Sequence, residues 1–489
     1  MAGLLGSSLP AGRRLLFVLH EPGYFRLYGS TIVEMGRRGW DVVLAFDYPD
    51  RRGSGLRVPA GAGSNVTSLG ALPGHVPSSA TLLRTALDYL RYLEPSFVRA
   101  GYLRRRVESR LPPALGFLTR VTGVPRWLVT AALFLARLAE RLVPANRATL
   151  DFVRTARPDA IVVTPAVIIG PRGARQTEVI KAARALGIPA IVGVASWDHL
   201  TSKGLIRIVP YALTVWNDTQ AREAEFHHRI PRHRILVTGA QSLDHWFEPA
   251  APNAVQDFRD MLGIDDNRHV VLFTGSSRKM APDVSEVEFV RRWLTALRAS
   301  KNADLREAFV LVRPHPSNLS QWEDVDLGDR HATVYPRTYT GLPLTDAEVE
   351  TFRHSLLASS AVVGVNTTAM IEAAILRRPV LTVRDAAFAH SQQQTLHFAY
   401  LTKDQGGFVV VADSLGEHAA QLEAALAGGG QALEASDRFV ERFVRPRGVT
   451  TSATTHLCDA IEGVATSGGV RSMARVGAHQ ERVVVAREP

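Results

Sequence analysis

The stretch AVVGVNTTAMIEAAILRRPVLTV, residues 361–383, contains two short apolar runs on either side of a helical pattern. The first run ends at Asn366, and the second begins at Pro379. Continuous apolar strands that alternate with helices are typical of parallel sheets covered on both faces. The stretch therefore predicts a strand–helix–strand unit of an α/β protein.

The same alternation extends over most of the 489 residues. We expect strands in the first half at 13–20, 41–47, 65–69, 159–165, 189–196, 211–217 and 233–239, and in the second half at 269–277, 308–316, 331–336, 361–366, 379–384 and 407–412. Two such sets predict two Rossmann-like domains. Their expected bounds are 1–247, with a helical insertion at about 80–156, and 248–465, followed by a disordered tail at 466–489.

Composition narrows the class of protein further. A single cysteine, Cys458, excludes an intramolecular disulfide and fits a reducing compartment. The longest apolar stretch, 127–143, contains Arg137, Glu140 and Arg141, so it falls short of the roughly 18 uncharged apolar residues that a spanning helix needs. The N-terminus places its apolar residues before its arginines, the wrong order for a secretory signal. We expect a cytoplasmic protein.

The net charge of +10 is concentrated in one segment, since residues 81–150 carry twelve arginines and four acidic residues. Leucines and aromatic residues alternate with these arginines at helical spacing. Such a segment can associate peripherally with an anionic membrane, or it can pack on the first sheet and leave a solvated basic face. We favour the membrane slightly. The arginines match no nucleic-acid-binding fold, so no nucleic acid partner is expected.

Polar residues follow the expected strands of the second domain, where parallel sheets bind ligands. Small hydroxyl residues, arginines and a histidine recur there: Gly275, Ser276, Ser277 and Arg278; then Arg313, Pro314 and His315; then Asn366, Thr367 and Thr368; then Arg384 and Asp385. These residue types bind anions and suit a nucleotide diphosphate. The phosphate loops of ATPases and dinucleotide dehydrogenases are missing from the sequence, which argues against both classes.

The helix after residue 366 has two interpretations. Asn366 or Thr367 can cap it, which leaves backbone N–H groups facing the strand ends. Glu372 lies one turn beyond Thr368 on the same face and can hold ribose hydroxyls. The alternative is an ordinary cap and a solvated glutamate.

The sequence VRPHP, residues 312–316, ends its strand with two prolines. Each proline restricts the residue before it, so Arg313 and His315 are held in extended geometry. This rigidity suits a phosphate contact, although a stiff strand exit alone also explains it.

The first domain offers its own candidates. His20 and Glu21 follow the first strand, and His20 can act as a base on an acceptor hydroxyl, with Glu21 as an acceptor or phosphate contact. Asp198, in SWDHLTSKG, is the rival base, and Lys203 is a phosphate contact. The structural alternatives are a histidine that satisfies a backbone group at the strand exit and a turn capped by Asp198.

Two patterns suggest metal binding, and we expect neither to bind metal. An Asp-x-Asp at 324–326 lies in a polar stretch that is typical of a solvated loop. His227, His228 and His233 have no cysteine or carboxylate partner at zinc-like spacing.

VRPHP and the longer stretch LLASSAVVGVNTTAMIEAAILRRPVLTV resemble the C-terminal half of GT-B-fold nucleotide-sugar transferases. The resemblance extends to SWDHLTSKG and to VWNDTQAREAEFHHRIPRHRILVTGAQSLDHWF, residues 215–247. It is closest to a superfamily of surface-polysaccharide transferases, CDP-glycerol glycerophosphotransferases and UDP-GlcNAc 2-epimerases. It implies two domains facing a cleft, with the donor nucleotide in the second domain. There Arg313 and His315 would contact the diphosphate, Thr367 and Thr368 a phosphate, and Glu372 the ribose.

The chain also departs from the members of this superfamily. It lacks the epimerase signature after LTVR and the acidic box of the glycerophosphotransferases. We therefore predict a metal-independent glycosyltransferase that needs no cofactor and moves a sugar from a nucleotide donor to a surface-polysaccharide or lipid-linked acceptor. In this enzyme His20 or Asp198 acts as base, and His315 assists the leaving group. The alternatives are a UDP-GlcNAc 2-epimerase, a polyol-phosphate transferase, and a non-catalytic membrane-surface scaffold.

Overall fold

A computed structural model describes residues 13–49, 65–120, 125–265, 267–278, 285–340, 344–428 and 430–467, in two compact units. The first unit is built from residues up to Val98, from Leu103–Ser242 and from the segment that begins at Phe443. The second is Leu243–Arg442 together with the short segment Arg99–Tyr102. Residues 1–12, for which no secretory signal was predicted, lie outside the described residues. Of the tail predicted at 466–489, residues 466 and 467 end a helix, and the rest lies outside the described residues.

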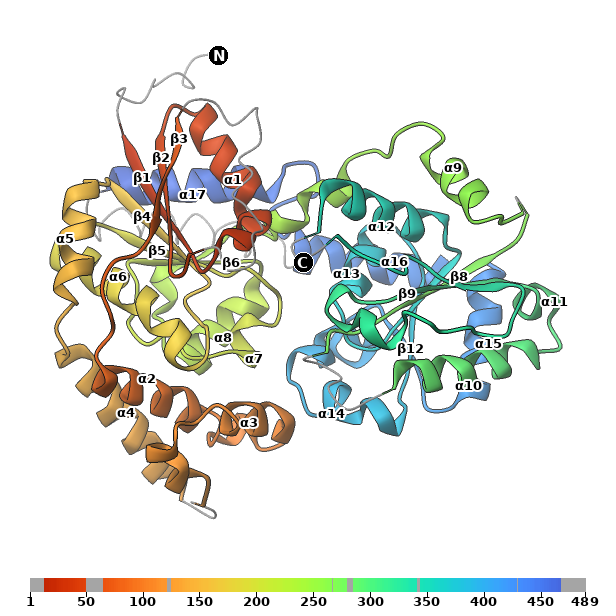
Figure 1. Ribbon diagram of the computed structural model, residues 1–489, viewed down its shortest axis with the longest axis horizontal. Helices are drawn as coiled ribbons and strands as arrows, with labels where there is room; N and C mark the ends of the chain where they lie inside the picture. Colours follow the sequence, from red (N-terminus) through yellow and green to blue (C-terminus); the bar gives the residue numbers. More distant parts are fainter. Residues whose placement is uncertain are drawn as a thin grey trace, which may run out of the picture. The chain divides into compact units, whose positions relative to one another are not determined.

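The first unit contains a seven-stranded parallel sheet in the order β3-β2-β1-β4-β5-β6-β7 (Figure 1). Its strands are β1 (Arg14–Leu19), β2 (Asp41–Phe46), β3 (Val66–Ala71), β4 (Ala160–Thr164), β5 (Ala190–Gly193), β6 (Ala212–Val215) and β7 (Ile235–Val237). All the strands predicted for this half are confirmed. Six of them, all except β3, are buried almost throughout because helices cover both faces of the sheet.

Helices cover this sheet in two layers. On one face α5 (Arg147–Ala156), α6 (Ala174–Ala185) and α8 (Asp218–His228) pack against residues such as Leu16 and Val18. On the other, α1 (Phe25–Arg37) and α17 (Ala453–Ser467) pack against residues such as Phe17.

The position of α17 corrects the predicted domain boundary at residue 465. Leu457, Cys458 and Ile461 of α17 are fully buried with α1 on the first sheet, so the chain returns to the first unit from Phe443 onward. The helical period of this segment predicts a helix with one buried face, but it does not predict which sheet that face contacts. The second unit therefore ends at Arg442, before the predicted residue 465.

The second unit contains a six-stranded parallel sheet in the order β10-β9-β8-β11-β12-β13. Its strands are β8 (Val270–Thr274), β9 (Phe309–Arg313), β10 (Ala332–Val334), β11 (Ala361–Gly364), β12 (Val380–Val383) and β13 (Val410–Ala412), and they confirm the prediction. Its helices are α9 (Ala254–Met261), α10 (Glu286–Arg298), α11 (Ala303–Arg306), α12 (Asp346–Ala358), α13 (Ala369–Ile375), α14 (Ala389–Gln392), α15 (Leu415–Leu426) and α16 (Gly430–Phe439). Trp293 of α10 and Leu422 of α15 are buried in the core of this sheet.

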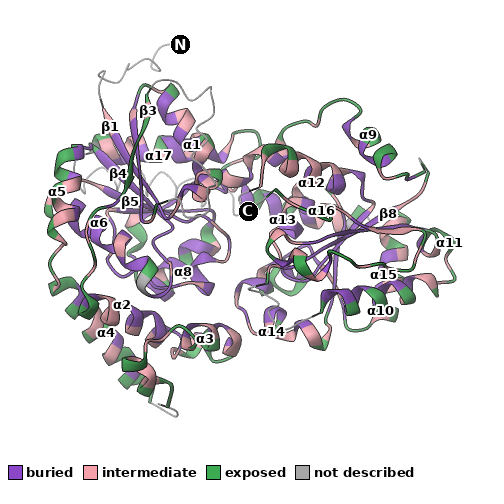
Figure 2. Ribbon diagram, viewed as in Figure 1, coloured by how far each residue is buried: buried purple, intermediate pink, exposed green. Residues whose placement is uncertain are grey.

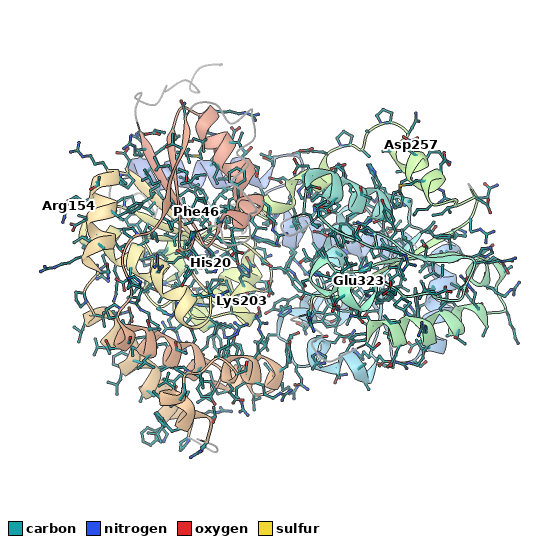
Figure 3. All side chains as sticks on the ribbon, in the orientation of Figure 1. His20, Phe46, Arg154, Lys203, Asp257 and Glu323 are labelled. Carbon is teal, nitrogen blue, oxygen red and sulfur yellow. The ribbon has the colours of Figure 1, made fainter. Side chains whose placement is uncertain are left out.

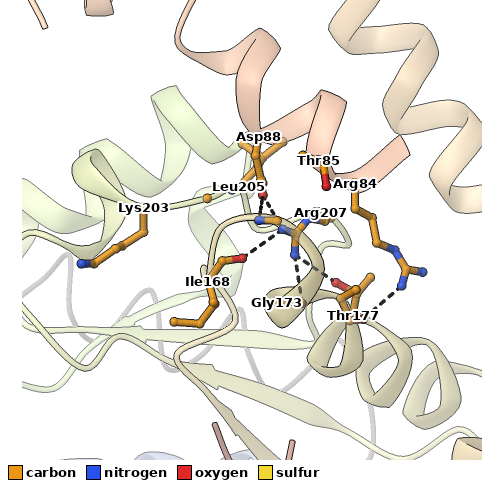
Figure 4. A network of polar contacts seen from close by, with 12 residues as sticks. Arg84, Thr85, Asp88, Ile168, Gly173, Thr177, Lys203, Leu205 and Arg207 are labelled. Carbon is orange, nitrogen blue, oxygen red and sulfur yellow. Dashed lines mark hydrogen bonds and ion pairs between the residues drawn. The ribbon is translucent and has the colours of Figure 1, made fainter. Parts of the chain in front are cut away.

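The helical insertion is α2 (Ser78–Arg91), α3 (Gly101–Glu108) and α4 (Arg126–Leu142), and α2 is anchored by buried charges (Figure 4). Asp88 accepts hydrogen bonds from the backbone N–H groups of Gly170 and Leu205, both at 2.9 Å, and pairs with Arg207 at 2.6 Å. Both Asp88 and Arg207 are buried. The pair therefore joins α2 to the loops that follow β4 and β5.

A second buried group ties α2 to α4 and α6. Arg84 pairs with Glu140 of α4 at 2.8 Å and with Glu178 of α6 at 2.5 Å, and Lys181 lies 2.7 Å from Glu140. These side chains are buried, so this part of the basic segment packs on the first unit, as the packing alternative expected. None of the described helices is long and apolar enough to cross a membrane.

We predict that Asp88→Ala destabilises the first unit by about 3–5 kcal/mol, because it leaves the Arg207 guanidinium buried without its counter-charge. Asp151→Ala, which removes an exposed ion pair with Arg154 at 2.6 Å, is the control and should cost less than about 1 kcal/mol. Urea unfolding followed by circular dichroism measures both. Equal small losses would contradict a supporting role for the pair.

Candidate functional site

Three neighbouring strands of the second sheet end side by side and bring the predicted anion-binding residues together. In the sheet order, β8 lies between β9 and β11. Gly275, directly after β8, donates its N–H to the carbonyl of Arg313 at 2.9 Å. A Cβ atom at Gly275 would lie only 2.9 Å from the His315 nitrogen, so the close approach of these two strand exits requires glycine.

His315 is held by the next turn of chain. Its Nδ1 accepts from the backbone N–H of Ser317 at 3.1 Å and lies 2.9 Å from the Ser317 hydroxyl. Because Nδ1 acts as an acceptor, the neutral tautomer with its proton on Nε2 is favoured. The proton on Nε2 makes that nitrogen a hydrogen-bond donor, which suits an anionic ligand. Pro316 begins the short 3₁₀-helix that supplies Ser317.

Arg313 is more deeply buried than the sequence suggested. Its guanidinium lies between the rings of Tyr335 and Phe352, with centroids 5.5 and 5.4 Å from Cζ. Its Nε and Nη1 atoms have no hydrogen-bond partner among the described residues. Burial lowers the pKa of Arg313, while Tyr339 acts in the opposite direction. The residue predicted to contact the diphosphate, Arg313, therefore has its guanidinium stacked between two aromatic rings.

The segment after β11 differs from the predicted cap. Asn366 is buried and donates from Nδ2 to the carbonyl of Ser391 at 2.7 Å, so it does not cap α13. The Thr367 hydroxyl accepts from the N–H of Ala369 at 3.4 Å, and Thr368 already has helical backbone angles. Glu372 lies in the first turn of α13 and is partly exposed. The N-cap position is Thr368, whose side chain makes no capping hydrogen bond, and Thr367 contacts only the first N–H group of the helix.

Glu286 is a buried residue of this site that the sequence analysis missed. Its carboxylate accepts from the backbone N–H of Ser276 at 2.6 Å and from Nδ2 of Asn318 at 3.4 Å. Asn318 also donates to the Ser276 carbonyl at 3.3 Å. Burial raises the pKa of Glu286 to about 7, against these hydrogen bonds. Glu286 and Asn318 therefore fix the backbone of Ser276, next to the partly exposed Ser277.

In the first unit, His20 and Asp47 form a buried pair at the carboxyl ends of the neighbouring strands β1 and β2. His20 Nδ1 lies 2.9 Å from Asp47 Oδ2, and both side chains are buried. An Nδ1–H donated to Asp47 leaves Nε2 as the basic nitrogen. Asp47 was not predicted, although it directly follows the second apolar run as His20 follows the first. This parallel position was the available signal.

Aromatic rings enclose the pair. The Tyr24 and Tyr48 rings each lie 5.6 Å from the His20 ring in edge-on geometry. Burial raises the pKa of Asp47 to about 6, and the nearby His20 lowers it. Burial also raises the pKa of Tyr24 to about 12, helped by the negative charges of Glu21, Asp198 and Asp47. The predicted acidic residues of this unit therefore lie near one phenol.

Asp198 is engaged within its own loop, just before α7 (His199–Ser202). Its oxygens accept from the hydroxyls of Ser196 at 2.7 Å and Ser202 at 2.5 Å, and Lys203 lies 3.8 Å away. These contacts favour the structural alternative over the role of a base. The Lys203 carbonyl accepts from the Tyr92 hydroxyl at 2.6 Å, so α2 supports this loop. His20 and Lys203 both lie in the first unit (Figure 3).

The two metal-like patterns occupy ordinary structural positions. Asp324 and Asp326 are exposed in a loop of the second unit, beside Glu323 (Figure 3). His228 is buried and neutral, since its Nδ1 accepts from the N–H of Ile206 at 3.0 Å and its Nε2 lies 2.8 Å from the Leu200 carbonyl. No group of three or more histidine, cysteine or carboxylate side chains among the described residues is placed to hold a metal ion.

Comparison with solved structures defines the fold. No protein-family model and no curated protein matches the chain. A glycosyltransferase from Rickettsia africae ESF-5 matches at a TM-score of 0.50 and 10% identity, over 93% of this chain and 99% of its own. UDP-GlcNAc 2-epimerase from Neisseria meningitidis, solved bound to UDP-GlcNAc, matches at 0.51 and 12%, over 92% and 99%. Anabaena HepE, solved in complex with UDP, matches at 0.50 and 10%, over 92% and 99%.

The chain therefore has the GT-B fold, the class that its sequence predicted. At these identities the likeness defines the architecture alone. The reaction has to be argued from the residues of this chain.

We predict a pH-dependent stability that originates at Glu286. Its pKa of about 7 in the folded state lies above the usual value of 4.5, so the stability that the protonated form provides is complete below about pH 4.5. That stability is lost as the pH rises through about 7, by about 3 kcal/mol at most.

Glu286→Gln should remove this loss, so the variant gains thermal stability relative to the wild type between about pH 5 and pH 9. Glu348→Gln is the matched control, because hydrogen bonds from Thr340 and Thr345 lower the pKa of Glu348. That variant should be less stable than the wild type at neutral pH. An unchanged melting-temperature difference across the range for Glu286→Gln would contradict the assignment.

Proposed function

We propose that this protein is a glycosyltransferase that moves a sugar from a nucleotide-activated donor to a glycan or lipid-linked acceptor without a metal ion. The His20–Asp47 pair carries this proposal. It couples a buried imidazole to a carboxylate at 2.9 Å, on the strand exits of a fold that glycosyltransferases use. An imidazole held in this way can act as the general base on an acceptor hydroxyl.

The second unit supplies the groups that suit the donor. His315 presents a donor nitrogen, Ser276 and Ser277 lie on the adjacent strand exit, and Thr367 and Glu372 begin α13. The solved relatives were bound to UDP-GlcNAc in one case and to UDP in another, which supports a uridine nucleotide as the first donor to test. In our proposal the diphosphate contacts His315 and Thr367, and Glu372 holds the ribose.

The proposed reaction is a displacement at the anomeric carbon. His20 Nε2 takes the proton of the acceptor hydroxyl while that oxygen forms a bond to the anomeric carbon. The bond from that carbon to the diphosphate oxygen breaks, and the nucleoside diphosphate leaves with the electron pair. Asp47 stabilises the imidazolium that forms, and the His315 Nε2–H group stabilises the charge on the leaving group.

The first experiment separates binding from turnover. We predict that UDP raises the melting temperature of the wild type and of His20→Ala, but not of His315→Ala or Glu372→Ala. Transfer should fall about 10²–10⁴-fold in His20→Ala, because the general base is lost. Donor hydrolysis and transfer are followed by release of the nucleoside diphosphate. Full activity in both His315→Ala and Glu372→Ala would refute the donor site.

Asp47→Asn tests the pair itself. The amide of Asn carries no negative charge to stabilise a protonated His20, so transfer should fall by at least about 10²-fold. UDP should still raise the melting temperature of this variant. In the wild type, transfer should also decline as the pH falls below about 6, where Asp47 becomes protonated. Asp198→Asn, in the same unit, is the control for the rival base. A larger loss in Asp198→Asn than in Asp47→Asn would reassign the base.

The same assays distinguish the remaining possibilities. Formation of the 2-epimer from UDP-GlcNAc without any acceptor would replace the transferase with an epimerase. A thermal shift with CDP-activated polyols but not with UDP would favour a polyol-phosphate transferase. No shift with any nucleotide would favour a non-catalytic scaffold. Peripheral association of residues 81–150 with the cytoplasmic face of a membrane belongs to the proposal, because it would give access to a lipid-linked acceptor.

A further inference from the structure

Helix α4 has two apolar faces, and the first unit uses one of them. Val129 and Leu133 are buried against Leu87 of α2 and Leu205, and Glu140 on the same side enters the buried charge cluster. These contacts fix the rotation of α4 about its axis. The opposite side of the helix is therefore presented outward by the packing of the protein itself.

That outward side is apolar along the length of the helix. Its exposed side chains are Trp127 at 68%, Leu128 at 41%, Phe134 at 65%, Leu135 at 61%, Leu138 at 42% and Leu142 at 77%. At about 100° per residue these positions fall within roughly 120° of arc, opposite Val129 and Leu133. Figure 2 shows the exposed residues along α4. Among the large apolar residues that are exposed in the described parts of the chain, half lie on this one helix.

The exposed charges of the segment that contains this face have one sign. The exposed charged side chains of the described residues between 81 and 150 are all arginines: Arg99, Arg104, Arg105, Arg110, Arg120, Arg126, Arg141 and Arg147. The four acidic residues of the segment are buried or partly buried, and each is engaged within the protein. Folding thus buries or pairs the acidic groups of this segment, and its fully exposed charges are all cationic.

We propose that the outer face of α4 inserts into the interface of an anionic lipid bilayer, with the helix lying in the plane of the membrane. Arg126 and Arg141, near the two ends of α4, would then contact lipid headgroups while Phe134, Leu135 and Leu138 contact acyl chains. Trp127 suits the boundary between the two regions. A second copy of this chain fits less well, because two such faces would bring their arginines together.

Membrane binding by α4 does not depend on the proposed function. Only its role, access to a lipid-linked acceptor, rests on that function. The inference corrects the predicted membrane segment in one respect. Arg84 and Arg91 of α2 are buried within the first unit, and Arg91 donates to the carbonyls of Lys203 and Gly204 at 3.1 and 2.9 Å. The surface that meets the membrane is therefore on α4, and α2 supports it from behind.

The test is co-sedimentation of the full-length protein with vesicles. We expect binding to phosphatidylcholine vesicles that contain phosphatidylglycerol, weaker binding to phosphatidylcholine alone, and weakening by salt. The double variant Phe134→Ser/Leu138→Ser should bind at least about tenfold less, since two apolar side chains no longer enter the bilayer. Phe226→Ser, at an equally exposed aromatic residue on α8, is the matched control and should bind as the wild type does.

Two further measurements keep the outcomes separate. The melting temperature of the double variant should match that of the wild type, because the two substituted side chains are exposed to solvent. Protection by UDP should also be unchanged, so a failure of vesicle binding can be told apart from a failure of the donor site. Unchanged vesicle binding by the double variant would overturn the proposal. The proposal would also be overturned if the wild type did not bind vesicles and light scattering showed that it is a dimer which the double variant does not form.

Discussion

The strands within each sheet all run in one direction, and this constraint organises both units. Because the strands are parallel, their carboxyl ends share one edge, and every polar residue that follows a strand is delivered to that edge. For this reason His20 lies beside Asp47, and Gly275 lies beside Arg313 and His315. The remaining features, from the glycine at β8 to the helices on both faces, follow from the need to bury such strands completely.

The sequence predicted the strands most successfully, because buried apolar strands recur in regular alternation with helices. Most of the predicted strands form because an apolar run can be buried between two layers of helices, although β3 is exposed along most of its length. The convergence of residues 275–277, 313–315 and 366–368 followed from the same logic, since strand exits could be listed before the strand order was known. The pattern could not predict that α17 packs on the first sheet, because an apolar helical face does not specify its partner.

The details of the candidate site were less accessible from the sequence because they depend on partners distant in the chain. Asp47 acquires its role only when β2 lies beside β1, and Glu286 only when α10 directs a carboxylate at Ser276. Arg313 was expected at an open rim, yet it is stacked between Tyr335 and Phe352. In the same way the twelve arginines of residues 81–150 look alike in sequence, and the fold buries two of them, partly buries two and exposes eight.

The return of α17 to the first sheet has a consequence for synthesis on the ribosome. The second unit is completed by Arg442, so its core can form before the chain is finished. One face of the first sheet is covered only in part, by α1, until Leu457, Cys458 and Ile461 have been synthesised. Although it begins the chain, the first unit is therefore the last to become complete during translation, and until then its nascent apolar face is open to chaperones.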